Sequence, residues 1–215
     1  MRIGILGTGD VGRAIGHGFV TLGHQTVLGS RSGNNETAAA WAEQHHPLGA
    51  AATFAEAASI GELLVIATKG SADVLHAVVE AAGPGSFAGK VVIDTTNPLD
   101  FSRGYPDLSI KGEDSGGELL QRLLPEARIV KAFNTTNNQL MFRPEIMGGP
   151  PDMFIAGNDA AAKTIVTGIL GDFGWNSIDC GPILSARWLE AMCMAWVMAS
   201  TARGNWRQAW RLIQA

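Results

Sequence analysis

The chain has 215 residues, of which 46% are hydrophobic and 17% are charged, which indicates one large globular domain or one domain with a small appendage. A net charge of −4 without any cluster of Lys and Arg argues against a nucleic-acid-binding surface. Glu190 interrupts the most apolar stretch, which is too short for a membrane span.

Apolar, strand-like runs alternate with helical segments over the first 135 residues. Strands are predicted at residues 3–6, 26–29, 63–67, 91–94 and 129–133, and helices at about 11–22, 36–45, 72–82 and 115–124. The last of these helices opens with a capping box, in which Ser115 caps the helix and Glu118 reaches back to the capping residue. This order predicts an α/β fold of the Rossmann type, with a doubly wound, mainly parallel sheet.

The pattern changes beyond residue 135. A polar stretch precedes a predicted strand at 153–156, a helix at about 160–173, a strand at 177–179 and a final helix after Pro182. We expect a Rossmann domain over residues 1–135 and a small C-terminal α/β lobe over residues 136–215, which would hold the substrate pocket and a dimer contact. The final helix carries a stripe of residues at helical spacing, namely Trp188, Met192, Trp196 and Ala199. Packing in the core or in a dimer contact is the favoured role of this stripe. The alternative is that it forms the wall of a pocket for a flat ring.

The residues from Gly7 to Gly12 match the pattern G-x-G-x-x-G between a predicted strand and a predicted helix, which is the context of a dinucleotide-binding loop. Gly7 permits the tight turn, Gly9 lets a pyrophosphate approach the backbone, and Gly12 lets the helix pack against the strand. The N-terminus of the helix would bind the pyrophosphate. The alternative is a glycine-rich turn without a ligand.

The second predicted strand ends in Ser30, Arg31 and Ser32, without the Asp or Glu with which an NAD site binds the ribose 2′-hydroxyl. The Arg31 guanidinium can form two hydrogen bonds to a 2′-phosphate, and both serine hydroxyls can donate to it. Such charge-assisted bonds contribute about 1.5–3 kcal/mol each, so the sequence predicts a preference for NADP over NAD of roughly tenfold or more. A solvated surface arginine is the alternative.

With these motifs, Asn97-Pro98 and the run from Val130 to Thr135, the chain resembles the deazaflavin (coenzyme F-420)-dependent NADP oxidoreductases, which are related to the reductase domain of the Steap metalloreductases. The resemblance spans nearly the whole chain and includes the segment from Asp179 to Glu190, which is similar to the family pattern D-x-G-x-L-x-x-x-R-x-L-E. It implies roles in coenzyme binding for Thr8, Gly9, Asp10 and Val11 at the pyrophosphate, Ser30 and Arg31 at the 2′-phosphate, Thr68 and Lys69 near the nicotinamide ribose, and Asn97, Pro98, Ala132 and Asn134 at further strand ends.

Two positions depart from the family pattern. Asn134 stands where deazaflavin-using members carry a histidine, which leaves the hydride acceptor open. Asn35 stands where those members carry a second basic residue, which predicts weaker binding of the 2′-phosphate.

The resemblance implies a homodimeric NADPH-dependent oxidoreductase that transfers a hydride between NADP(H) and a deazaflavin (coenzyme F-420) or flavin-like acceptor. The two cysteines, Cys180 and Cys193, have no CxxC or metal-ligand spacing, which indicates a reducing, cytoplasmic compartment. Because hydride exchange between stacked rings depends mainly on positioning, no catalytic side chain is assigned, and no metal site is expected. The alternatives are reduction of a small carbonyl, imine, quinone or ferric chelate, and a non-catalytic NADPH sensor.

Two lysines and one long segment leave their roles open. Lys131 lies inside an apolar run, so a structural or ion-pair role is favoured over catalysis. Lys69 follows a strand end, where it could contact the coenzyme, act as an acid or be solvated. Residues 99–114 form a long polar segment beside Pro98 and are interpreted as a lid or as a disordered loop.

Overall fold

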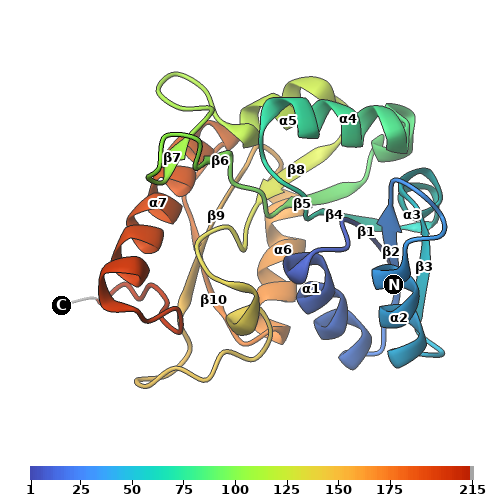
Figure 1. The fold of residues 1–215 in the computed structure, drawn as a ribbon, viewed down its shortest axis with the longest axis horizontal. Helices are drawn as coiled ribbons and strands as arrows, with labels where there is room; N and C mark the ends of the chain where they lie inside the picture. Colours follow the sequence, from blue (N-terminus) through green and yellow to red (C-terminus); the bar gives the residue numbers. More distant parts are fainter. Residues whose placement is uncertain (214–215) are drawn as a thin grey trace.

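The computed structural model describes residues 1–213, whose elements form an α/β/α arrangement with one large sheet between two helical layers (Figure 1). The strands are β1 (Arg2–Leu6), β2 (Gln25–Ser30), β3 (Gly49–Thr53), β4 (Leu63–Ile66), β5 (Val91–Asp94), β6 (Leu99–Asp100), β7 (Asp107–Leu108), β8 (Arg128–Lys131), β9 (Asp152–Gly157) and β10 (Asn176–Asp179). The α-helices are α1 (Asp10–Thr21), α2 (Glu36–Gln44), α3 (Phe54–Ile60), α4 (Ala72–Ala82), α5 (Gly116–Leu123), α6 (Ala160–Asp172) and α7 (Ala186–Arg203).

The large sheet has eight strands in the order β10-β9-β8-β5-β4-β1-β2-β3. Neighbouring strands run parallel, except that β9 lies antiparallel to β8. The chain moves outward from β1 to β3 and then returns to β4 on the other side of β1, which makes a topological switch point between β1 and β4. The predicted doubly wound, mainly parallel sheet is thereby confirmed, and ligands of such sheets bind at the carboxyl ends of the strands around the switch point.

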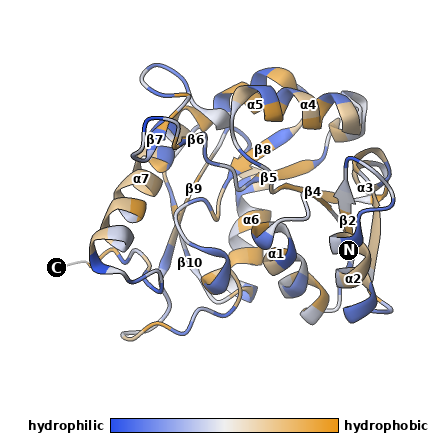
Figure 2. Ribbon diagram, in the orientation of Figure 1, coloured by the Kyte–Doolittle hydropathy of each residue, from blue (hydrophilic) through white to orange (hydrophobic). Residues whose placement is uncertain are grey.

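Both faces of the sheet are buried, which explains the continuous apolar runs of its central strands. In β4, Leu63 and Val65 pack into the core that faces α1, α2 and α6, whereas Leu64 and Ile66 pack into the core that faces α3, α4 and α5. The helices carry both hydrophilic and hydrophobic residues, as expected when only one side of each packs on the sheet (Figure 2).

Strand β3 and helix α3 were not predicted from the sequence. The strand reads Gly-Ala-Ala-Ala-Thr and pairs only with β2 at the edge of the sheet, so it has neither the large apolar residues nor the alternation that mark a strand. Helix α3 begins with a capping box, in which the Thr53 hydroxyl accepts from the Glu56 N–H at 3.2 Å and the Glu56 carboxylate accepts from the Thr53 N–H at 2.8 Å. This Thr-x-x-Glu pattern is the signal that could have revealed the helix.

The strands predicted beyond residue 135 continue the large sheet, as β9 beside β8 and β10 beside β9. Val130 and Met153, from either side of the expected domain boundary, belong to the same core cluster. The division into residues 1–135 and 136–215 stays a prediction.

Helix α7 buries a different face from the predicted stripe. Trp196 is buried, but Trp188 is 70% exposed and Ala199 is also exposed, so core packing is wrong for these two positions. The buried face consists of Ala186, Leu189, Glu190, Cys193, Trp196, Val197 and Ser200. Across residues 1–213, no helix combines the length and the apolar character needed to cross a bilayer.

Residues 99–108 fold as a hairpin of β6 and β7, in which Leu99 pairs with Leu108. The Ser109 N–H donates to the Pro98 carbonyl at 2.7 Å, and Leu99 packs against the cluster of Cys193, Trp196 and Val197. The expectation of a disordered loop is therefore wrong, while a role as a lid stays a prediction.

Candidate functional site

The predicted site residues lie along the side of the sheet formed by the carboxyl ends of its parallel strands. They follow the carboxyl ends of five consecutive strands in the order β2, β1, β4, β5 and β8, at Ser30 to Ser32, Gly7 to Gly12, Thr68 and Lys69, Asn97 and Pro98, and Ala132 and Asn134 respectively. Their contacts with a coenzyme stay a prediction.

The three glycines of the loop after β1 have different surroundings. A Cβ on Gly7 would lie 2.2 Å from the Ala67 carbonyl oxygen, and one on Gly12 would lie 2.2 Å from the Gly7 carbonyl oxygen, so close backbone packing requires both glycines. A Cβ on Gly9 would have no heavy atom within 4 Å. Gly9 caps α1 without a side-chain hydrogen bond, so the backbone beside it is accessible and the N–H groups of the first turn can bind an anion.

The end of β2 presents a cation beside this loop. Arg31 and Ser32 are exposed, whereas Ser30 is buried and its hydroxyl donates to the Ser32 carbonyl. Asn35 caps α2, since its side-chain oxygen accepts from the Ala38 N–H at 2.9 Å. This capping bond gives Asn35 a structural role at the position where the resembling family carries a basic residue.

The loops that follow β4 and β5 are in contact. A Cβ on Gly70 would lie 2.4 Å from the carbonyl carbon of Asn97, so only glycine lets the two backbones approach this closely. Thr68 is partly exposed and its hydroxyl donates to the Lys69 carbonyl at 3.2 Å, while Lys69 itself is exposed.

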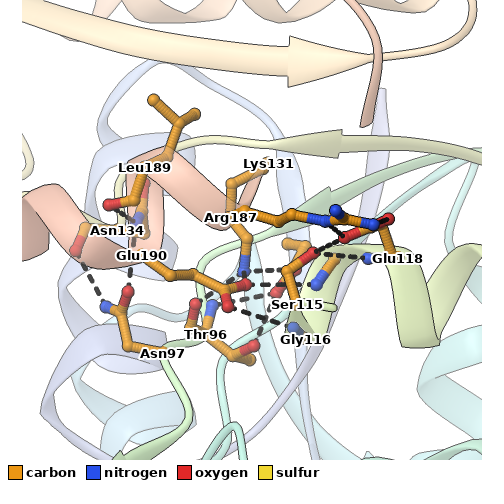
Figure 3. A network of polar contacts seen from close by, with 12 residues as sticks. Thr96, Asn97, Ser115, Gly116, Glu118, Lys131, Asn134, Arg187, Leu189 and Glu190 are labelled. Atoms are coloured by element: carbon orange, nitrogen blue, oxygen red, sulfur yellow. Dashed lines mark hydrogen bonds and ion pairs between the residues drawn. The ribbon is translucent and has the colours of Figure 1, made fainter. Parts of the chain in front are cut away.

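Two asparagines connect the loops after β5 and β8. The Asn97 side-chain N–H donates to the Asn134 backbone carbonyl at 2.8 Å. The Asn134 side-chain N–H donates to Asn97 Oδ1 at 3.0 Å and to the Leu189 carbonyl at 2.9 Å (Figure 3). Phe133, just before Asn134, is buried and has a positive φ of 61°, an uncommon conformation for a bulky residue that tertiary packing must maintain. The turn that carries Asn134 is thus held by the hydrogen bonds of Asn134 and by the packing of Phe133.

A buried ion cluster contacts residues that adjoin these asparagines. It consists of Asp94, Lys131 and Glu190, which we refer to as the buried triad. Lys131 Nζ lies 2.6 Å from Asp94 Oδ2 and 2.8 Å from Glu190 Oε1, and it donates to the Thr96 carbonyl at 2.7 Å. The Lys131 side chain is 0% exposed and therefore uses all three of its donors inside the protein. The ion-pair role expected for Lys131 is confirmed.

The two carboxylates of the triad also bind backbone groups. Glu190 accepts from the N–H groups of Gly116 and Gly117 at 3.0 and 3.1 Å, which satisfies the first turn of α5. Asp94 Oδ1 accepts from the Thr96 N–H at 2.9 Å and from the Thr96 hydroxyl at 2.8 Å. Burial by itself would lower the pKa of Lys131, but the charges of Asp94 and Glu190 and their hydrogen bonds raise it above its ordinary value.

A second charged group stands beside the triad on α5. The Ser115 hydroxyl accepts from the Glu118 N–H at 3.1 Å, which confirms the predicted cap. Glu118 reaches back to the capping residue as predicted, since its carboxylate accepts from the Ser115 hydroxyl at 2.8 Å. The same carboxylate forms two bonds of 2.7 Å with Arg187 on α7 (Figure 3). Arg187 competes for the same carboxylate, and no local sequence rule could foresee this partner.

Asp94, Thr96 and Gly70 were not predicted from the sequence as members of this site, and no partner was predicted for Glu190. The available signals were an Asp at the end of an apolar strand and a Glu within an apolar helix. Within residues 1–213, no group of three or more His, Cys, Asp or Glu residues is arranged to hold a metal ion.

Comparison with known proteins shows which family the chain is similar to. The family model described as NADP oxidoreductase coenzyme F420-dependent matches residues 2–98. Metalloreductase STEAP3 of Rattus norvegicus is 30% identical over 196 residues, which cover 89% of this chain and 36% of that protein. The chain thus spans only about a third of the length of the curated relatives it matches.

Solved structures give a closer match. A protein of Arthrobacter sp. FB24, provisionally named an F420-dependent NADP reductase, has 37% identity and a TM-score of 0.91, with 99% of each chain covered. The reductive aminase of Aspergillus terreus in complex with NADPH and ethyl-5-oxohexanoate has 20% identity and a TM-score of 0.69, with 94% of this chain and 62% of that chain covered, a likeness of fold alone.

Proposed function

Since the chain belongs to the family of coenzyme F420-dependent NADP oxidoreductases, we propose that it binds NADP(H) and transfers a hydride between this coenzyme and a deazaflavin or flavin-like ring. The observation that carries the proposal is the pairing of an accessible Gly9 backbone at the N-terminus of α1 with the exposed Arg31 at the end of the neighbouring strand. An anion on α1 and a second anion on Arg31 match the pyrophosphate and the 2′-phosphate of NADP.

The residues at the carboxyl edge would divide the coenzyme between them. The first turn of α1, from Gly9 to Val11, would bind the pyrophosphate. Arg31 and Ser32 would bind the 2′-phosphate directly, and Ser30, whose hydroxyl donates to the Ser32 carbonyl, would hold the turn that presents them. The nicotinamide end would extend past Thr68 and Lys69 toward Asn97 and Asn134. Gly9 supports this assignment because it leaves space for a ligand, whereas Gly7 and Gly12 are occupied by packing.

The expected chemistry needs positioning more than proton transfer. When bound, NADPH supplies the hydride from C4 of its dihydronicotinamide ring. Asn97 and Asn134 fix the floor on which that ring would lie, and the Phe133 turn holds Asn134 in place. Lys131 contributes to this floor but does not serve as an acid, because all its donors are bound and its pKa is raised.

Dimerisation and location complete the proposal. We propose a homodimer, supported by the exposed apolar side chains of Leu184, Trp188 and Met198 on and beside α7. Cys180 and Cys193 are both free thiols, which supports a reducing, cytoplasmic compartment. Light scattering after size-exclusion chromatography gives the mass in solution, and a mass near 22.6 kDa would contradict the dimer.

The activity is tested by following NADPH oxidation at 340 nm against oxidised deazaflavin, FMN, FAD, quinones, small imines and ferric chelates. The proposal expects turnover with the deazaflavin or the flavins and a large preference for NADPH over NADH. Turnover only with a carbonyl, imine, quinone or ferric chelate would move the protein to a different acceptor class. Tight NADPH binding without turnover of any acceptor would instead favour a non-catalytic sensor.

A further inference from the structure

The buried triad carries an unbalanced charge. It contains the carboxylates of Asp94 and Glu190 and only one ammonium, that of Lys131, so its formal net charge is negative. The three side chains are 0% or 1% exposed, which leaves this charge with little screening by solvent or salt. The neighbouring charged groups on α5 and α7, Glu118 and Arg187, pair with each other at 2.7 Å and add no net charge.

Part of the negative charge is offset by α5. Glu190 accepts from the N–H groups of Gly116 and Gly117 at the N-terminus of this helix, where the aligned peptide dipoles are equivalent to roughly half a positive charge. The triad and the helix end together therefore remain net negative. The same N–H groups satisfy the Glu190 oxygens.

The triad is connected to the amide pair of Asn97 and Asn134 through neighbouring residues. Lys131 binds the carbonyl of Thr96, the residue before Asn97. Asn134 binds the carbonyl of Leu189, the residue before Glu190 (Figure 3). The triad is thus connected to each of the two asparagines through a single intervening residue, Thr96 or Leu189.

We propose that the buried triad sets the redox preference of the bound coenzyme by favouring the cationic nicotinamide ring of NADP⁺ over the neutral ring of NADPH. This inference rests on the proposed function, because it requires the nicotinamide at Asn97 and Asn134. Hydride transfer breaks the C4–H bond, moves the proton with both bonding electrons to the acceptor, where a new bond to hydrogen forms, and leaves a positive charge on the nicotinamide ring. A site that stabilises this charge lowers the reduction potential of the bound coenzyme and makes bound NADPH a stronger hydride donor. Asp94 and Glu190 are positioning residues in this scheme, since they act on the ring through space without touching it.

The test compares the dissociation constants of NADP⁺ and NADPH in the wild type and in Glu190→Gln. Removing one negative charge is expected to raise the ratio of Kd for NADP⁺ to Kd for NADPH by roughly three- to tenfold. A tenfold change corresponds to about 30 mV for this two-electron couple. The matched control is Glu62→Gln, which removes a carboxylate that pairs with Arg2 at 3.1 Å at the amino ends of β1 and β4, and its ratio should equal that of the wild type.

Thermal unfolding separates electrostatics from loss of structure. A loosened site weakens both coenzyme forms alike, whereas lost charge changes their ratio. Should Glu190→Gln fail to fold, Asp94→Asn removes the same charge from the other side of Lys131 and is expected to shift the ratio in the same direction. The double variant Lys131→Met/Glu190→Gln restores the formal charge and is expected to restore the ratio.

An unchanged ratio in a folded variant that binds both forms would overturn the inference and leave the proposed function intact. A wild type that binds neither NADP⁺ nor NADPH would instead contradict the proposed function, and the inference with it.

Discussion

Asn97 and Asn134 bind each other through two hydrogen bonds, one from each side-chain amide, at 2.8 and 3.0 Å. The bonds fix the direction of both amides, because Asn97 uses its N–H on a carbonyl and must present its oxygen to Asn134. The pair joins the loops of β5 and β8 at the position where we expect the nicotinamide.

Asn134→Ala removes the donors to Asn97 and Leu189. We expect kcat/KM for NADPH to fall by roughly 10- to 100-fold because the ring loses its fixed floor, while the affinity for 2′-phospho-ADP-ribose, which lacks the nicotinamide, stays unchanged. Steady-state kinetics and calorimetric titration measure the two quantities. Asn176→Ala, at the β10 edge of the sheet, is the control. An equal loss of affinity for the fragment would show that the effect is not confined to the nicotinamide end.

The glycine loop offers a comparison of two single-methyl changes. Gly9→Ala should leave the melting temperature nearly unchanged, because its Cβ meets no atom within 4 Å, yet weaken NADPH binding by crowding the pyrophosphate. Gly12→Ala should lower the melting temperature, because its Cβ would lie 2.2 Å from the Gly7 carbonyl oxygen. Calorimetry and NADPH titration of both variants provide the measurement. Normal NADPH affinity in Gly9→Ala would argue against the pyrophosphate position.

Arg31→Ala tests the choice between NADP and NAD. We expect KM for NADPH to rise by about tenfold or more, with little change for NADH, since the lost bonds belong to the 2′-phosphate. Arg203→Ala, at the exposed end of α7, should change neither constant. Equal increases of KM for NADPH and NADH would contradict the assignment of Arg31 to the 2′-phosphate.

Lys131→Met leaves two buried carboxylates without their shared cation. We expect the free energy of unfolding to drop by about 3–5 kcal/mol, the usual result of removing one partner from a buried ion pair. Urea titration measures the change. In the control Lys111→Met, the lost cation pairs with Asp107 on the surface, and the change should stay below about 1 kcal/mol.

The contribution of Lys131 should depend on pH. Because its pKa in the folded protein lies above the ordinary value of 10.5, its stabilising effect is fully present below that value and is lost as the pH rises through the folded-state pKa. The difference in unfolding free energy between the wild type and Lys131→Met should therefore stay constant from neutral pH to about pH 10 and shrink above it. A difference that shrinks already near pH 8 would contradict the closed triad.

The two thiols should differ in reactivity. Burial raises the pKa of the Cys193 thiol to about 12, whereas Cys180 is partly exposed. At pH 8, Ellman's reagent should modify one thiol in the native protein and the second only after denaturation. Cys180→Ser should abolish the native reaction, and a reaction that survives this change would show that Cys193 is accessible.

Much of the Rossmann fold could be predicted because its central strands are continuous apolar runs and its helices have clear ends. β3 could not, since three alanines carry too little apolar surface to mark a strand. Helix α7 was predicted, but its buried face was not. The apolar Trp188 is exposed and the charged Glu190 is buried, which is the opposite of what their polarity suggests.

The positions of the candidate site residues could be predicted, but their side-chain partners could not. Strand ends place Arg31, Asn97 and Asn134 at one edge without any knowledge of side-chain contacts. The partners of Lys131 were not predictable, because they come from β5 and α7, and only the folded chain brings Asp94 and Glu190 together.

The bond between Glu190 and the Gly116 N–H spans 74 residues, and this separation has a consequence for biosynthesis. Helix α5 and strand β8 are translated long before the carboxylate that completes them. Until α7 is synthesised and docks, Lys131 has one carboxylate instead of two, and the first turn of α5 lacks its acceptor. Contacts between residues so far apart in the sequence carry a loop-closure cost that slows their formation. Maturation of the nicotinamide end is thus coupled to completion of the chain, and a nascent chain truncated before Glu190 would assemble the sheet around an unfinished centre.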